Sequence, residues 1–174
     1  MEALVETERL ILREILPEDE AAFFELDSDP EVHQYLGKRP VQNIEQIRIV
    51  INYIREQYKE NGIGRWAVVT KSDNAFIGWA GLKLFTDEVN GHIDFYELGY
   101  RFMKKHWGKG YATEAAKAIV KYGFEELELD EIYGMTDPQN ETSKKVLEKV
   151  GLKYIETFDF LGEPADWFMI SREF

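Results

Sequence analysis

Cysteine is absent from this chain of 174 residues. Its absence excludes a disulfide framework and a thiolate nucleophile, and with them catalysis through a cysteine-bound acyl intermediate. Histidine is scarce, and the three histidines, His33, His92 and His106, share no metal-ligand spacing. We therefore predict no metal site.

Long hydrophobic runs are also absent. No apolar stretch is long enough to span a bilayer, and Met1–Leu4 lacks the charged-then-apolar pattern of a secretory signal. We therefore expect a cytoplasmic protein with no membrane partner. Positive charge is in deficit as well, and the net charge of −12 argues against nonspecific binding of nucleic acid.

The composition that remains suits one ordinary domain. With 174 residues, 44% of them hydrophobic, and no linker or repeat, we predict a single domain over residues 1–174. Periodicity, caps and turn residues predict four helices, at about 17–29, 43–62 with its caps, 110–126 and 141–149. They predict seven strands, at about 7–15, 66–70, 76–85, 93–103, 132–136, 152–160 and 165–173.

The segment Glu97–Ala116 is the most informative part of the chain. It begins as an alternating strand, passes through a loop with Gly108 and Gly110, and continues as an amphipathic helix. The first backbone N–H groups of a helix have no partner inside it, and the helix dipole favours negative charge there. A glycine loop that leads into such a helix therefore predicts a site for a phosphorylated ligand.

Two common phosphate-binding motifs do not fit this loop. A P-loop needs a Lys-Ser/Thr pair after its last glycine, but Tyr111 follows Gly110. A dinucleotide fingerprint needs three spaced glycines in the first strand–helix unit of a parallel sheet, whereas here two glycines lie past the midpoint of the chain. The motifs therefore argue against a nucleotide-binding α/β protein.

Three segments in the correct order resemble the GCN5-related N-acetyltransferase (GNAT) superfamily. The loop Trp107–Ala112 is similar to the family's Gln/Arg-x-x-Gly-x-Gly/Ala loop, with Trp107 in place of Gln or Arg. Asp137–Ser143 with Leu147–Leu152 resembles its Asn-x-x-Ser helix and the strand that follows. Thr7–Arg13 is typical of the first strand in the branch that includes the ribosomal-protein N-terminal acetyltransferases. The matches run from about residue 7 to the end.

The resemblance implies an α/β (α+β) fold of the GNAT type. This fold has a mixed, mostly antiparallel sheet of about seven strands and about four flanking helices. The parallel strands 4 and 5 splay apart, and the pantetheine arm of acetyl-CoA lies in the gap between them. In this chain these are the strands before and after the helix at 110–126.

The resemblance also implies the residues that bind acetyl-CoA, mostly through backbone amides of the glycine loop and its flanks. They are Arg101, Phe102, Met103, Trp107, Gly108, Lys109, Gly110, Tyr111, Ala112, Thr113 and Asn140.

Amide formation from a thioester needs a group that accepts the proton of the amine, directly or through water. Glu97 is our candidate for this base, because family members often carry a catalytic glutamate on the strand that leads into the phosphate loop. Without the family resemblance, Glu97 would better be interpreted as a solvated charge on a half-exposed strand. Asp94 is the second choice. Since the chain has no cysteine, we expect direct attack on acetyl-CoA in a ternary complex.

Ser143 is our candidate for the acid or stabiliser of the leaving thiolate. Many family members have tyrosine at this position, and a serine hydroxyl is a far weaker acid, so a hydrogen bond to the sulfur is the alternative to proton donation. Asn140 is expected to cap the helix and to contact the pantetheine amide. The alternative is that Ser143 is an ordinary serine in the first turn of a helix, with no role in catalysis.

We therefore predict an acetyl-CoA-dependent N-acetyltransferase whose acceptor is a protein N-terminus or a small-molecule amine. The alternative is a catalytically silent acyl-CoA-binding sensor or scaffold. The sequence is compatible with a monomer or a homodimer.

Overall fold

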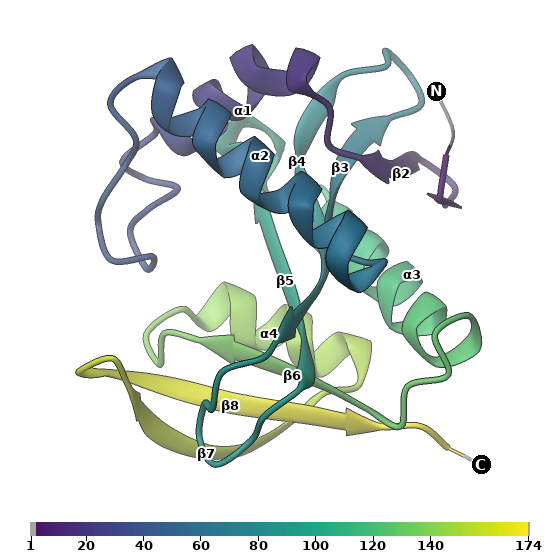
Figure 1. Cartoon of the computed structure of the whole chain (residues 1–174), viewed down its shortest axis with the longest axis vertical. Helices are drawn as coiled ribbons and strands as arrows, with labels where there is room; N and C mark the ends of the chain where they lie inside the picture. The colour runs from purple at the N-terminus through teal and green to yellow at the C-terminus, as the bar shows by residue number, and fades with distance from the viewer. Residues whose placement is uncertain (1–2, 174) are drawn as a thin grey trace.

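In the computed structural model, which describes residues 3–173, eight strands form one mixed sheet in the order β1-β2-β3-β4-β5-β6-β8-β7 (Figure 1). The strands are β1 (Val5–Glu6), β2 (Leu10–Glu14), β3 (Arg65–Thr70), β4 (Phe76–Phe85), β5 (Phe95–Phe102), β6 (Glu131–Thr136), β7 (Lys153–Phe160) and β8 (Glu163–Ser171). The helices are α1 (Glu20–Asp27), α2 (Ile44–Asn61), α3 (Tyr111–Glu125) and α4 (Glu141–Val150), with short 3-10 turns at Pro17–Asp19 and Lys104–His106.

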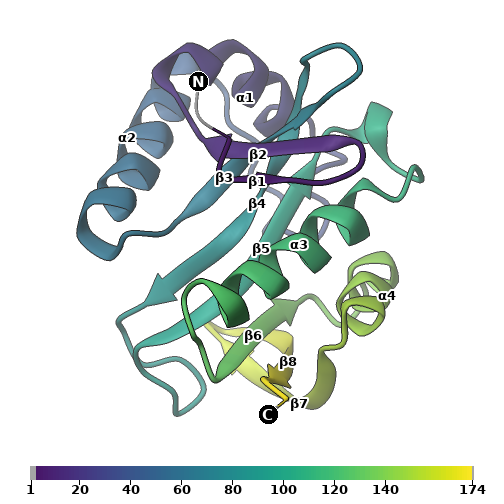
Figure 2. The same ribbon diagram turned by 90° about the vertical axis from the view of Figure 1, so that its right-hand side faces the viewer.

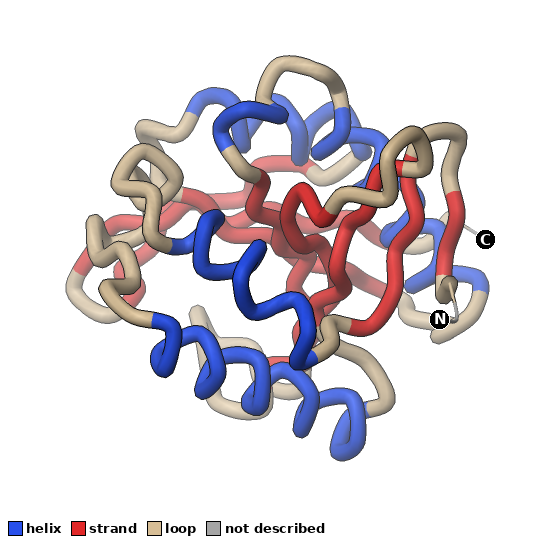
Figure 3. The backbone as a smooth tube through the Cα atoms, turned by 90° about the horizontal axis from the view of Figure 1, so that it is seen from above, coloured by secondary structure: helices blue, strands red, loops and turns tan. Residues whose placement is uncertain are grey.

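Helices cover both faces of the sheet, as Figures 2 and 3 show. On one face, α3 and α4 bury a core that includes Leu98 and Phe102 of β5. On the other face, α1 and α2 bury a second core that includes Trp79 and Met103. The predicted alternation of β5 is therefore confirmed, because its even-numbered residues face α3 and the odd-numbered ones face the side of α1 and α2.

The predicted sheet lacked one strand. The chain was expected to enter the sheet at residue 7, but Val5 and Glu6 already pair with Leu12 and Ile11 of β2. A two-residue strand carries too short an alternation to be found from sequence. The predicted helix at 17–29 is a 3-10 turn followed by the shorter α1, and the other predicted elements occur within a few residues of their expected bounds.

The caps of α2 are those that the sequence predicts. The Asn43 side chain accepts a hydrogen bond from the backbone N–H of Gln46 at 3.1 Å. The Gln46 side chain in turn accepts the backbone N–H of Asn43, which completes a capping box. Gly62 ends the helix in the left-handed conformation, with φ of 71°.

The parallel pair β5 and β6 separates, as the resemblance implies. These strands pair at a single position, Glu97 with Tyr133, whereas every other neighbouring pair in the described sheet is antiparallel. Toward their C-terminal ends, Leu98–Phe102 of β5 and Gly134–Thr136 of β6 no longer pair with each other. The backbone of β5 is therefore open along this edge.

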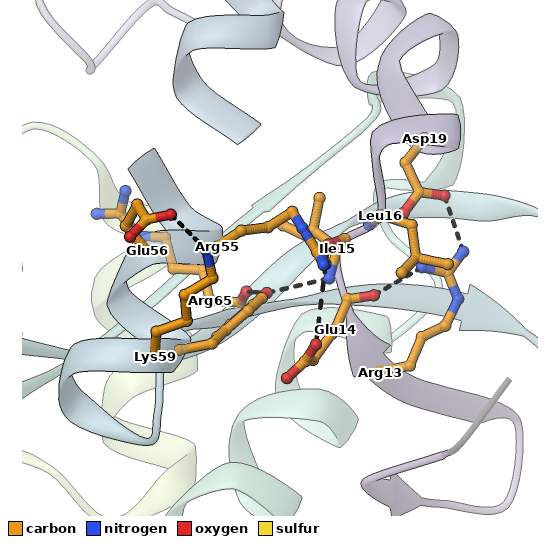
Figure 4. A network of polar contacts seen from close by, with 10 residues as sticks. Arg13, Glu14, Ile15, Leu16, Asp19, Arg55, Glu56, Lys59 and Arg65 are labelled. Atoms are coloured by element: carbon orange, nitrogen blue, oxygen red, sulfur yellow. Dashed lines mark hydrogen bonds and ion pairs between the residues drawn. The ribbon is translucent and has the colours of Figure 1, made fainter. Parts of the chain in front are cut away.

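A buried ion pair holds the turn between β2 and α1 (Figure 4). The Arg13 guanidinium donates two hydrogen bonds to the Asp19 carboxylate, at 2.7 and 2.8 Å. Asp19 also accepts the backbone N–H of Leu16 at 2.8 Å. Both side chains are about nine-tenths buried, so water solvates neither charge and each is compensated by the other.

We predict that Asp19→Ala lowers the free energy of unfolding by about 3–5 kcal/mol, because it leaves the Arg13 charge buried without a partner. Glu56→Ala is the control, since it removes an exposed i,i+3 pair with Lys59 and should cost less than about 1 kcal/mol. Urea unfolding of both variants measures the two losses. Equal losses would show that the buried Arg13–Asp19 pair contributes no more to the free energy of unfolding than an exposed pair does.

Candidate active site

The backbone of the glycine loop depends on its two glycines. Gly108 and Gly110 both adopt left-handed conformations, with φ of 73° and 80°, which favour glycine. Gly110 is the N-cap residue of α3, and no side chain caps that helix end. The first intrahelical bond runs from the N–H of Glu114 to the carbonyl of Gly110, so the N–H groups of Tyr111, Ala112 and Thr113 are available to an anion.

Arg9 fastens this loop to the β1–β2 hairpin, a role that the sequence did not reveal. Its guanidinium donates to the carbonyl of Lys109 at 2.8 Å and lies over the Tyr111 ring at 4.4 Å. It also donates to the Glu114 carboxylate at 2.7 Å. Arg9 therefore contacts the loop, the first residue of α3 and the first acidic residue of that helix.

Glu114 places a negative charge in the first turn of α3, beside the expected anion site. Partial burial raises its pKa, but hydrogen bonds from Thr7 and Arg9 outweigh burial and hold the pKa below 4.5. Thr7 Oγ1 donates to Glu114 at 2.6 Å. The ionised carboxylate is thus engaged by the hairpin, which reduces its repulsion of a phosphate.

Several other residues that we expect at the cofactor have side chains that are engaged within the protein. Phe102 and Met103 are buried, so their side chains belong to the two cores. The Trp107 indole N–H donates to the carbonyl of Phe102 at 2.8 Å and braces the loop against the end of β5. The Arg101 side chain points to the opposite face of the sheet, where it donates to Asp27 at 2.8 Å.

Glu97 lies at the one paired position of β5 and β6, where the strands begin to diverge. Its side chain is on the face of α1 and α2. Burial raises the pKa of Glu97 above 4.5, and the nearby charges of Arg65 and Lys83 oppose that shift. Asp94, the second choice, is exposed and precedes β5.

Ser143 lies in the first turn of α4, as predicted. The Asn140 side chain caps the helix by accepting the N–H of Ser143 at 3.2 Å. The Tyr100 hydroxyl donates to the carbonyl of Ser143 at 3.0 Å and lies 2.9 Å from Ser143 Oγ. Because a phenol has one proton, the serine hydroxyl donates to Tyr100 when Tyr100 donates to the carbonyl.

Tyr100 was not identified from the sequence as part of the site. It is three residues past Glu97 on the open stretch of β5, and burial raises its pKa to about 12. Its contact places Ser143 beside that stretch on the side of α3 and α4. Glu97 and Ser143 therefore approach the diverging strands from opposite faces of the sheet.

His92 and His106 have separate surroundings. The His92 ring stacks on Trp167 at 5.1 Å and lies 5.0 Å from the Tyr133 ring. It borders a surface pocket near the N-terminal ends of β5 and β6, where Phe95 and Glu131 also contribute to the lining. His106 lies beside Tyr111 at 6.2 Å. Within residues 3–173, no group of three His, Cys, Asp or Glu residues is arranged to hold a metal ion.

Known proteins are similar to this chain in sequence and in fold. A family model described as an acetyltransferase (GNAT) domain matches residues 9–153. An uncharacterized N-acetyltransferase p20 of Bacillus licheniformis is 35% identical over 84% of this chain and 80% of its own length. The chain belongs to the GNAT acetyltransferase family.

Solved structures agree with this family. An acetyltransferase (GNAT family) from Bacillus anthracis superposes with a TM-score of 0.79 and 29% identity, over 96% of this chain and 97% of its own. The ribosomal L7/L12 alpha-N-protein acetyltransferase RimL, solved with coenzyme A, superposes with a TM-score of 0.82 at 13% identity, over 98% of both chains. The second likeness concerns the fold alone.

As a GNAT protein, the chain is an acetyl-CoA-dependent N-acetyltransferase. The fold it was predicted to have is confirmed, with one strand more than expected. None of the helices between residues 3 and 173 is long and apolar enough to cross a membrane.

We predict that Gly108→Asp weakens coenzyme A binding at least tenfold more than Gly108→Asn does. A Cβ at Gly108 meets nothing within 4 Å, and Asn and Asp, which are nearly equal in size, both tolerate the left-handed conformation. The two variants differ only in a negative charge beside the expected phosphates. Calorimetric titration with coenzyme A measures the difference. Equal affinities would mean that the phosphates bind away from this loop.

Proposed function

We propose that this acetyltransferase transfers the acetyl group directly from acetyl-CoA to a primary amine of a small molecule or a protein N-terminus. Acetyl-CoA and the amine are bound together, and no acyl-enzyme forms. The amine nitrogen attacks the thioester carbonyl, the C–S bond breaks, and coenzyme A leaves as a thiolate that takes up a proton. The proposed binding surface is the backbone of residues 107–113 with the open edge of β5.

The observation that carries this proposal is the position of Glu97. It stands where β5 and β6 begin to diverge, and burial raises its pKa. A carboxylate with a raised pKa is a stronger base than an exposed one, and it faces the side of the sheet opposite α3. It can therefore take a proton from an amine that approaches from the side of α1 and α2.

Ser143 is proposed to stabilise the thiolate with one hydrogen bond. Its hydroxyl is shared with Tyr100, so it must rotate away from the tyrosine to donate to sulfur. Tyr100 is itself a weak acid with a pKa of about 12, and solvent is therefore the proposed source of the proton that coenzyme A takes up.

A turnover assay that follows free coenzyme A across a panel of amines tests the function. Release that depends on the amine supports an acetyltransferase with this site. Coenzyme A binding without release for any amine in the panel would support a silent acyl-CoA-binding module instead.

We predict that Glu97→Gln lowers kcat/KM by roughly 10²–10⁴-fold with coenzyme A affinity unchanged. In the wild type, the rate should fall as the pH drops through a pKa above 4.5, since protonation removes the base. The deficit of the variant should narrow at high pH, where more of the amine is already neutral. Glu148→Gln, on an exposed face of α4, is the control. A pH–rate profile identical to wild type would remove Glu97 from the mechanism.

We predict that Ser143→Ala lowers kcat by about 10–100-fold, which is what the loss of one hydrogen bond to a developing charge costs. Tyr100→Phe keeps the ring and releases the serine hydroxyl, so it should lower kcat less than about threefold. Steady-state kinetics of both variants gives the comparison. A larger loss in Tyr100→Phe than in Ser143→Ala would assign the leaving group to the tyrosine.

A further inference from the structure

Two arginines flank one indole on the sheet face that carries Glu97. The guanidinium carbon of Arg65 lies 4.4 Å from the centroid of the Trp79 ring, and that of Arg101 lies 5.2 Å from it. The three side chains come from the neighbouring strands β3, β4 and β5, where Trp79 pairs directly with Arg101. Both cations therefore lie against the same indole near the centre of the sheet.

The two arginines differ in their partners. Arg101 donates to Asp27 at 2.8 Å, and that carboxylate is 5% exposed. For Arg65, no hydrogen bond or ion pair to its guanidinium occurs among residues 3–173, and its Nε is buried without an acceptor. A guanidinium offers five donors in a planar fork that matches a carboxylate. The donors of Arg65 are therefore available to a ligand.

Glu97 and Trp79 border the same bare position on the sheet. A Cβ built on Gly99 lies 3.2 Å from Glu97 Oε1 and 3.3 Å from Cζ3 of Trp79. Gly99 of β5 pairs with Gly81 of β4, which in turn pairs with Arg65 of β3, so only Gly81 lies between Arg65 and β5 in this row of the sheet. The main chain of Gly64 and Arg65 already occupies the space above Gly81, at 2.6 and 2.7 Å from a Cβ built there. Glu97 and Arg65 are therefore connected on this face through Trp79, which lies against both Gly99 and the Arg65 guanidinium.

The charges around this position are mostly positive. Lys83 lies opposite Glu97 in the sheet, and its ammonium is 5.6 Å from the ring centroid of Tyr53, a half-exposed residue of α2. Burial lowers the pKa of Arg65, and the repulsion from Arg101 adds to this effect, whereas the negative charge of Glu97 opposes it. In a chain with a net charge of −12, Arg65, Arg101 and Lys83 thus form a local concentration of positive charge.

We propose that the acceptor is an amine that also carries a carboxylate, as a free amino acid does. Its amine lies at Glu97, its carboxylate is bound by Arg65, and its carbon skeleton lies against Trp79. This inference rests on the proposed function, and it narrows the acceptor class from any primary amine to amino-acid-type amines.

The test compares free L-amino acids with their primary amides as acceptors, which differ in the carboxylate. Arg65→Gln should lower kcat/KM for the acids by about 10–100-fold, mainly through KM, and change kcat/KM for the amides less than about threefold. Loss of Arg65 also raises the pKa of Glu97, and the amines of acids and amides differ in pKa. The readout is therefore the acid-to-amide ratio in the variant divided by the same ratio in the wild type.

Arg48→Gln is the matched control, because it changes an exposed arginine of α2 that pairs with Glu20 and should leave the ratio unchanged. Thermal unfolding checks that Arg65→Gln is folded. If it is not, Arg65→Lys replaces it, since a lysine keeps the charge, loses the fork and should still lower the ratio.

Four outcomes would overturn the inference. An unchanged ratio would mean that Arg65 does not recognise the carboxylate of the acceptor. Acetylation of simple amines but of none of the amino acids would mean that the enzyme does not accept amino acids. Turnover of phosphoethanolamine that depends on Arg65, without turnover of amino acids, would assign the arginine to a phosphate. Coenzyme A binding with no turnover of any amine would overturn the proposed function as well as this inference. The other outcomes leave turnover of some amine, so the two failures are distinguishable.

Discussion

The single paired position between β5 and β6 is the constraint on which the rest of the site depends. Because β5 and β6 pair only at Glu97 and Tyr133, the backbone of Leu98–Phe102 is paired with β4 on one edge and has no strand partner on the edge toward β6. Backbone groups in such a position need other partners, and the family resemblance supplies one in the extended, amide-containing pantetheine arm. The separation also allows α4 to bring Ser143 beside Tyr100.

Long-range polar contacts hold the two sides of this opening. Arg9 ties the glycine loop to the first hairpin through Lys109 and Glu114. Arg101 ties β5 to Asp27 at the end of α1, so the strand that carries Glu97 is fixed on the face of α1 and α2 as well. The open edge of β5 thus lies in a rigid frame, which is what positioning of two substrates requires.

Charge is distributed unevenly between the frame and the bulk of the protein. The chain has 33 acidic and 21 basic residues, yet Arg65, Arg101 and Lys83 gather around one catalytic candidate. The charges of Arg65 and Lys83 limit the rise in the pKa of Glu97 that burial causes, so the carboxylate stays ionised over more of the pH range. The same cations suit the acceptor that we propose.

The sequence by itself determined what depends on a few neighbouring residues: the Asn43 and Asn140 caps, the end of α2 at Gly62, the alternation of β5, and, through the resemblance, the family fold. Only the tertiary structure decided the contacts of Arg9 with Glu114, Tyr100 with Ser143, and Arg65 with Trp79. These partners come from different strands and helices, and strand register with helix packing sets their distances. No local pattern carries that information, because each of these residues alone is ordinary at its position in the chain.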